Sequence, residues 1–280
     1  MENLMVILDA GKVNMNTVEF ACYLANLTHS KLNLYFMERM IGEETPKQKL
    51  LLALPYVETV TAGDIPENRT NAIHYAENEK IVCEACTNRG ANYKILKDKH
   101  PNLQQLKMES RFADLIVLDP EISLGEEEGE ILSSSLERFL HASECPILFA
   151  PYAFYGIDEL LFAYDGSRGS LSAIRSFGRL FPELNHLHTT VIQISDGDEF
   201  VFGENKKGLE QIASVYPNLQ FKHLKGEASD QMLDLLIGKT RTAVVLGAFG
   251  RGFSSMMFKP SLARMIIRTL NLPVFISHPN

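Results

Sequence analysis

Two segments in the second half of the chain carry residue types that hold phosphate groups. They are Asp165, Gly166 and Ser167, and a glycine-rich stretch that includes Gly247, Gly250 and Arg251 and leads to Ser261. Glycine lets backbone N–H groups approach a phosphate closely, and the start of a helix adds a partial positive charge. These features predict an anion site. The alternative is that the glycines only allow positive φ angles in a turn.

The sequence contains no complete set of catalytic groups. It lacks the G-x-S-x-G pattern of a nucleophile elbow and the GxxxxGK[ST] pattern of a P-loop. Cys83 and Cys86 form a C-x-x-C near the end of a helical segment, without a second such pair or a histidine pair at zinc spacing. We therefore predict no catalytic activity and no bound metal, with the cysteines packed in the core.

The elements that must position these residues occur twice along the chain. The apolar run that ends at Asp9 is matched by the run that ends at Asp165, and a segment with helical spacing follows each. Later pairs are 93–97 with 221–225, 113–118 with 242–247, and 146–149 with 273–276. The repeat predicts five strands in each half, with helices between them.

Short apolar runs that alternate with helical segments are typical of α/β proteins with a parallel sheet covered on both faces. We predict a Rossmann-like fold with two tandem domains, 1–152 and 153–280, each an open five-stranded parallel sheet with helices on both faces. Residues 39–69 form an insertion that we expect to be partly helical. The short link near 151–157 suggests that the halves pack as a pseudo-dimer. Ligands bind beyond the carboxyl ends of the strands in such sheets.

The corresponding edge of the first half differs in charge. Asp119 stands where Gly247 stands in the second half, and residues 119–130 contain five Glu and one Asp. These carboxylates would repel a phosphate group. We therefore predict that the first half has lost anion binding and that Asp9 is a structural remnant.

Composition narrows the class of protein. The chain has 280 residues, of which 45% are hydrophobic and 22% charged, which excludes a disordered chain, a collagen and a coiled coil. Residues 1–150 carry 14 Lys and Arg against 23 Asp and Glu, whereas residues 151–280 carry 13 against 12. The second half is therefore the less repulsive host for an anion.

The same numbers bear on partners and location. A net charge of −8 argues against nucleic acid as a partner. There is no run of 18 apolar residues and no signal-peptide pattern at the N-terminus, which argues against a membrane protein. Four cysteines in 280 residues do not form a disulfide framework, so we expect a cytoplasmic protein.

The second half resembles the universal stress protein (UspA-like) family. Nucleotide-binding members have a Gly, two residues, a second Gly, nine residues, a third Gly and then Ser or Thr. Gly247, Gly250 and Ser261 match this pattern, but Pro260 replaces the third glycine. Asp165 stands at the family's strand-one aspartate. The resemblance covers nearly the whole chain as two tandem copies, of which the first is degenerate.

The resemblance implies an adenine nucleotide alpha-hydrolase-like fold, a role in the stress response and an adenine nucleotide, ATP or AMP, as ligand. The residues that it implies for nucleotide binding are Asp165, Gly166, Ser167, Ile194, Gly247, Gly250, Arg251 and Ser261. Pro260 has no backbone N–H and adds bulk, which disfavours a triphosphate; alternatively it only starts a helix. The family pairs its fifth strands, here 146–149 and 273–276, within one chain or between the chains of a homodimer.

Two alternatives remain open at this point. One is a nucleotide-hydrolysing enzyme of related α/β fold, for which Asp165 is the one candidate catalytic residue. The other is an interaction module in which neither half binds a ligand.

Overall fold

A computed structural model describes residues 1–41, 47–50, 57–60, 62–99, 101–124, 134–197, 199–202, 206–247 and 260–277. Two of the residues assigned to the predicted site, Gly250 and Arg251, lie outside the described residues, as does the side chain of Ser261. None of the described helices is long and apolar enough to cross a membrane.

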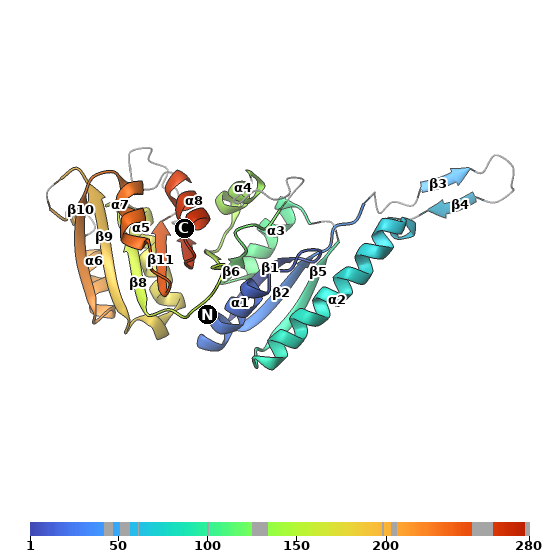
Figure 1. Cartoon of the computed structure of the whole chain (residues 1–280), viewed down its shortest axis with the longest axis horizontal. Helices are drawn as coiled ribbons and strands as arrows, with labels where there is room; N and C mark the ends of the chain where they lie inside the picture. The colour runs from blue at the N-terminus through green and yellow to red at the C-terminus, as the bar shows by residue number, and fades with distance from the viewer. Residues whose placement is uncertain are drawn as a thin grey trace.

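The main sheet has ten strands (Figure 1). In the first half they are β1 (Asn3–Asp9), β2 (Lys31–Met37), β5 (Tyr93–Asp98), β6 (Leu115–Leu118) and β7 (Ile147–Phe149). In the second half they are β8 (Glu159–Ala163), β9 (His188–Ser195), β10 (Leu219–Lys225), β11 (Thr242–Gly247) and β12 (Val274–Ser277). The order across the sheet is β10-β9-β8-β11-β12-β7-β6-β1-β2-β5, so each half has the order third, second, first, fourth, fifth.

Helices cover both faces of this sheet. They are α1 (Met15–Leu27), α2 (Pro66–Asn88), α3 (Leu103–Glu109), α4 (Ser134–Ala142), α5 (Arg168–Leu180), α6 (Lys206–Val215), α7 (Ala228–Leu236) and α8 (Pro260–Thr269), with short 3-10 turns η1 (Ala62–Asp64), η2 (Ser110–Phe112) and η3 (Pro182–Leu184). Buried residues of α1, α2, α5 and α6 share one apolar cluster, and those of α3, α4, α7 and α8 share the other. The fold is therefore a three-layer α/β fold, as predicted.

The two halves join along their fifth strands. Strands within each half are parallel, whereas β7 and β12 are antiparallel, with Phe275 opposite Leu148 and Ile276 opposite Ile147. The sequence left open whether these strands pair within one chain or between chains, and in this structure they pair within the chain. Instead of two separate sheets there is one sheet made of two parallel sets of five, while the division of the chain at 152 and 153 stays a prediction.

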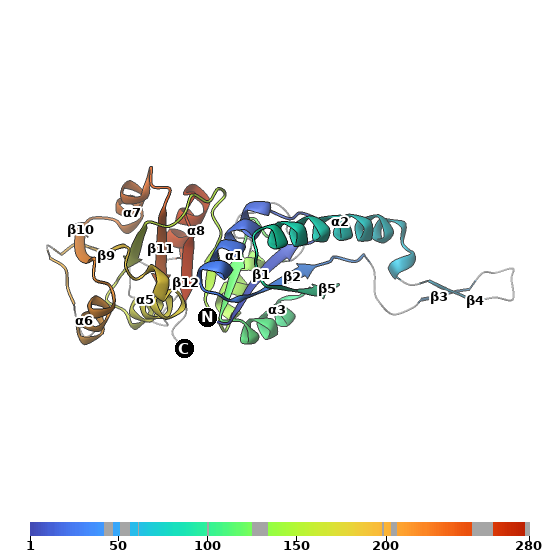
Figure 2. The same ribbon diagram turned by 90° about the horizontal axis from the view of Figure 1, so that it is seen from below.

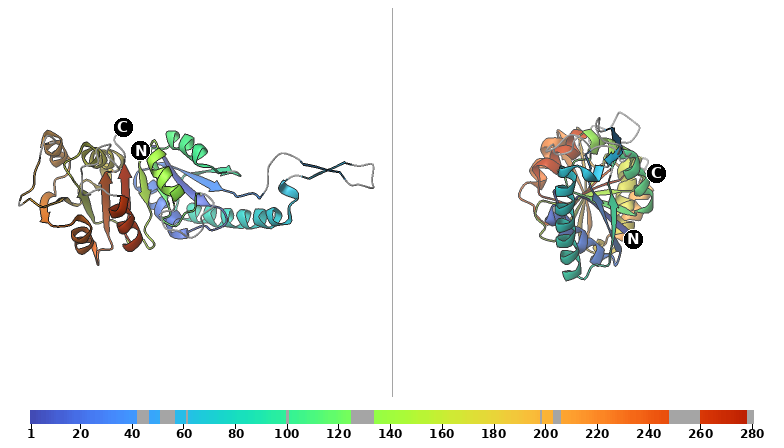
Figure 3. Two further views of the ribbon diagram at one scale, coloured as in Figure 1. Left: turned by 90° about the horizontal axis from the view of Figure 1, so that it is seen from above. Right: turned by 90° about the vertical axis from the view of Figure 1, so that its right-hand side faces the viewer.

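The sheet twists strongly along its length, as β-sheets do. In Figure 2, α1 and α2 lie above the sheet in the first half, whereas α5 and α6, which cover the same face, lie below it in the second half. Figure 3 shows the same molecule from above and end-on, with the two halves side by side along the long axis.

The insertion is more complex than its prediction. Residues 39–69 were expected to be partly helical, and η1 and the first residues of α2 lie in this range, but the antiparallel pairing of β3 (Lys47–Leu50) with β4 (Val57–Val60) ahead of them was not predicted. The hairpin extends beyond the end of α2 (Figure 1). Two valines and a threonine in β4 favour a strand, and this β propensity outweighs the helical character of the flanking residues.

The end of β11 packs tightly against the first turn of α5. A Cβ atom built on Gly247 would lie 2.6 Å from the backbone N of Ser170 and 2.8 Å from the carbonyl carbon of Gly169. Both neighbours are backbone atoms, so they cannot swing aside as a flexible side chain would. The absence of a side chain at Gly247 therefore sets how close α5 lies to the strand.

We predict that Gly247→Ala destabilises the protein by about 1–3 kcal/mol, because β11 or α5 must shift to admit the methyl group. Urea denaturation measures the free energy of unfolding. Gly197→Ala is the control, because among the described residues its Cβ would meet only the Ser195 hydroxyl, at 3.4 Å. A Gly247→Ala variant as stable as this control would contradict the packing argument.

A second prediction concerns the joint between the halves. Phe275 is fully buried in β12, and its ring meets that of Phe177 edge to face at 5.3 Å between centroids. Phe275→Ala should lower the free energy of unfolding by about 3–5 kcal/mol. Tyr155→Ala, an exposed aromatic control, should change it by less than about 0.5 kcal/mol. Equal effects of the two variants would refute a buried joint.

Candidate functional site

The strand order defines where a ligand would bind. In each half the first and fourth strands are neighbours, β1 beside β6 and β8 beside β11, and their connections leave in opposite directions. Ligands of open α/β sheets bind in the crevice at this switch point, beyond the carboxyl ends of the strands. The chain therefore has two such edges.

At the β8/β11 edge, Asp165 is held by the first turn of α5. Its Oδ1 accepts hydrogen bonds from the backbone N of Ser167 at 2.9 Å and from the Ser170 hydroxyl at 2.7 Å. Ser167 is the N-cap of α5, because its hydroxyl accepts from the backbone N of Ser170 at 3.1 Å. Gly166 has a φ of +82°, which a residue with a side chain rarely adopts. The turn thus fixes the carboxylate at the helix start.

The structure brings together part of the predicted site. Gly247 lies beside Ser170 at the same edge as Asp165, Gly166 and Ser167. Pro260 is the first residue of α8, in agreement with the interpretation that it starts a helix, and Ser261 follows it. Ile194 is 4% exposed and packs in the apolar cluster beneath α7, so its side chain is part of the core.

Sequence reasoning missed a row of arginines on α5. Arg168, Arg175 and Arg179 are exposed, and none of them has an ion-pair partner among the described residues. They line a groove of about 520 Å³ with Ser277, which ends β12. The signal was present in the sequence, because residues separated by 4, 7 and 11 positions lie on one face of a helix.

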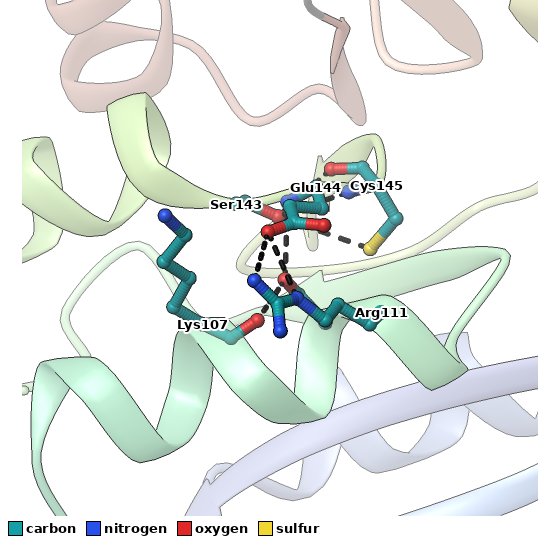
Figure 4. A network of polar contacts seen from close by, with 6 residues as sticks. Lys107, Arg111, Ser143, Glu144 and Cys145 are labelled. Carbon is teal, nitrogen blue, oxygen red and sulfur yellow. Dashed lines mark hydrogen bonds and ion pairs between the residues drawn. The ribbon is translucent and has the colours of Figure 1, made fainter.

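The turn between α4 and β7 also lines this groove. Because β7 runs antiparallel to β12, the start of β7 lies beside the end of β12, and this brings Glu144 to the groove. Arg111 of η2 binds the Glu144 carboxylate at 2.9 Å (Figure 4). This hydrogen bond holds the pKa of Glu144 below its usual range. Arg111 therefore balances the negative charge of Glu144, and the positive charges of the three α5 arginines are not balanced by this carboxylate.

The residues around Glu144 form one network (Figure 4). The Ser110 hydroxyl accepts from the backbone N of Glu144 at 3.0 Å, and the Ser143 hydroxyl donates to the carbonyl of Cys145 at 2.9 Å. Burial raises the pKa of the Cys145 thiol to about 12. The thiol therefore stays protonated at neutral pH and is a packing group rather than a nucleophile.

The β1/β6 edge of the first half has a cavity of about 910 Å³, which sequence reasoning did not predict. Asp9 lies in it and pairs with Arg39 at 3.3 Å, and its Oδ1 accepts from the backbone N of Gly11 at 2.9 Å. Arg39 also donates to the carbonyl of Ser123 at 2.6 Å. The partner of Asp9 is thus a cation that lies two residues beyond the end of the neighbouring strand, β2.

Carboxylates outnumber cations around this cavity. The acids are Asp9, Asp119 and Glu121, and the bases are Lys12 and Arg39. Lys12 pairs with Glu121 at 3.7 Å, so both cations already have anionic partners. This distribution favours the prediction that the first half does not hold a phosphate.

Comparison with known proteins gave matches only among solved structures. No protein-family model matches the chain, and no curated protein matches it in sequence. A universal stress protein from Archaeoglobus fulgidus DSM 4304 superposes with a TM-score of 0.67 at 16% identity, over 100% of both chains.

Two proteins of Pseudomonas aeruginosa are also similar. A candidate universal stress protein from strain UCBPP-PA14 has a TM-score of 0.61 at 15% identity and covers 99% of this chain and 94% of its own. A functionally unknown protein from strain PAO1 has a TM-score of 0.59 at 14% identity, over 99% and 92%. At these identities the likeness concerns the fold alone. The whole chain, with both halves, therefore has the fold of universal stress proteins.

Proposed function

We propose that this protein is a non-catalytic universal stress protein of the cytoplasm, which senses an adenine nucleotide, ATP or AMP, at the β8/β11 edge of its second half. The observation that carries the proposal is the placement of Asp165, the first turn of α5 and Gly247 together at the switch point of the strand order. The fold shared with universal stress proteins supports it.

The electrostatics of this edge suit a phosphate group. The start of α5 contributes a partial positive charge, and Arg168, its first residue, contributes a full one. Asp165 uses Oδ1 for the helix turn, and its other oxygen has no hydrogen-bond partner among the described residues, so it can accept from a ribose hydroxyl or a base amino group. Phosphate and nucleoside would thus bind neighbouring groups.

The absence of catalysis is the second part of the proposal. A hydrolase needs a group that activates water and a group or metal that stabilises the leaving phosphate. At the described ends of β8 and β11 themselves, Asp165 is the one carboxylate, and it is bound to the helix turn. Such a carboxylate is suited to recognition rather than to proton transfer.

The first test is Pro260→Gly, which restores a backbone N–H at the start of α8. A hydrogen bond to a charged phosphate is worth about 1.5–3 kcal/mol, so ATP affinity should rise by roughly tenfold or more. Isothermal titration calorimetry with ATP and with AMP measures the change. No gain for ATP would contradict the expectation, taken from the family's glycine pattern, that a phosphate of ATP contacts the start of α8.

The second test is Asp165→Asn, which keeps the acceptor for the helix turn and removes the charge. Nucleotide affinity should fall by about tenfold, and neither the native protein nor the variant should release phosphate from ATP. Asp234→Asn, at an exposed position of α7, is the matched control and should bind as the native protein does.

Steady phosphate release by the native protein that disappears in Asp165→Asn would establish the enzyme alternative. Native mass spectrometry of freshly purified protein addresses the interaction module. A bound adenine nucleotide would rule the module out, and an unliganded chain that also fails to bind in calorimetry would overturn the proposed function.

A further inference from the structure

The cavity of the first half arises from the length of one turn. Asp165 precedes the N-cap of α5, Ser167, by two positions, whereas Asp9 precedes the N-cap of α1, Asn14, by five. Gly11, Lys12, Val13 and Asn14 of this longer turn line the cavity. This cavity of about 910 Å³ is within the size range of small-molecule sites.

An unpartnered hydroxyl lies in the wall of this cavity. Thr17 is the third residue after its N-cap, as Ser170 is in α5, but it does not reach the strand-one aspartate as Ser170 does. Its Oγ1 is fully buried and has no hydrogen-bond partner in the described part of the chain. Burying a hydroxyl without a partner is unfavourable, so this atom indicates a group that the cavity receives.

The cavity also has one carboxylate without a cation. Arg39 pairs with Asp9, and Lys12 pairs with Glu121. Asp119 is half-buried, and its Oδ1 accepts from the backbone N of Glu121 at 2.8 Å, but no Lys or Arg of the described residues pairs with it. One negative charge therefore remains unbalanced at the edge of β6.

The remaining walls contain both apolar and polar residues. Ile7, Leu8, Val13, Met15, Ile41 and Ile122 are apolar, and Asn14, Asn71 and Ser123 are polar. The ring of Tyr75 completes the lining, and its hydroxyl is already bound to the carbonyl of Arg39 at 3.0 Å. An apolar body would fill this space, and an aromatic ring or a cation would find a partner in Tyr75.

We propose that the first half binds a small organic cation without phosphate groups, whose ammonium pairs with Asp119, whose apolar body fills the cavity and whose polar group meets the Thr17 hydroxyl. This site is separate from the proposed nucleotide site, because it lies at β1/β6 and not at β8/β11. A nucleotide is disfavoured there because both cations are already paired.

Tyramine is the probe, because it has one ammonium, one aromatic ring and one hydroxyl. Its matched control is 4-hydroxyphenylacetate, which has the same ring and hydroxyl but a carboxylate in place of the ammonium. Calorimetry on the full chain should find one bound tyramine per chain and no binding of the acid. Absence of saturable tyramine binding at millimolar concentration, or equal binding of the acid, would overturn the proposal.

Two variants assign the contacts. Asp119→Asn keeps the acceptor for the Glu121 N–H and should weaken tyramine binding by about tenfold. Thr17→Val keeps the side-chain shape, so the free protein should melt at a higher temperature, while tyramine binding weakens severalfold. Tyramine affinity unchanged in both variants, relative to the Asp234→Asn control, would show that the hydroxyl and the carboxylate have no part in a binding site. ATP affinity, which depends on Asp165, should be unaffected in both.

Discussion

The antiparallel pairing of β7 and β12 is the contact on which the rest of the structure depends. Three residue pairs, from Val274 opposite Phe149 to Ile276 opposite Ile147, join two parallel sets of strands into one sheet. The pairing also makes the apolar layer continuous, since Leu148, Phe275 and Val245 follow one another across the joint on the same face. Because the two sets run in opposite directions, their carboxyl ends lie at opposite edges of the sheet. The two candidate sites are therefore reached from different sides.

The two halves share one strand order but differ in the connection after the first strand. In the second half a short turn lets the Ser170 hydroxyl bind Asp165, which closes the helix start onto the strand. In the first half the connection is three positions longer, Arg39 binds Asp9, and the Thr17 hydroxyl has no partner among the residues that the structure describes. The same position in the helix thus has a structural role in one half and faces a cavity in the other.

Much of the fold could be predicted from the sequence, because the apolar runs and the repeat are local signals. The strands, their pairing through 146–149 and 273–276, and the helix start at Pro260 all follow from short stretches of residues. The pairing of β3 with β4 was missed because β propensity over four residues is a weak signal beside a long helix. The cavity could not be predicted, since it is lined by the turn after β1, the segment after β2 and the segment after β6, which are far apart in the sequence.

For the predicted site the result is mixed for a similar reason. Asp165, Gly166 and Ser167 are adjacent in sequence, so their joint placement is a local property, and the structure confirms that Gly247 lies beside them. Ile194 lies in β9, and the side chain of Ile194 is buried in the core. Which face of the sheet a strand residue occupies depends on the register of the strand, which a short motif does not specify. The arginine row on α5 had a sequence signal, namely its helical spacing, but it lies outside the motif that guided the prediction.

The joint between the halves also decides which strands stay open to solvent. With β7 and β12 paired, the outermost strands of the sheet are β5 and β10. Each carries two exposed lysines, at 94 and 97 and at 222 and 225, whereas Ile147–Phe149 and Val274–Ser277 have no charged residue. Lysines on an edge strand discourage further strands from adding to the sheet. The two uncharged strands, β7 and β12, are therefore paired with each other, and the two strands that remain at the edges of the sheet carry lysines that disfavour aggregation.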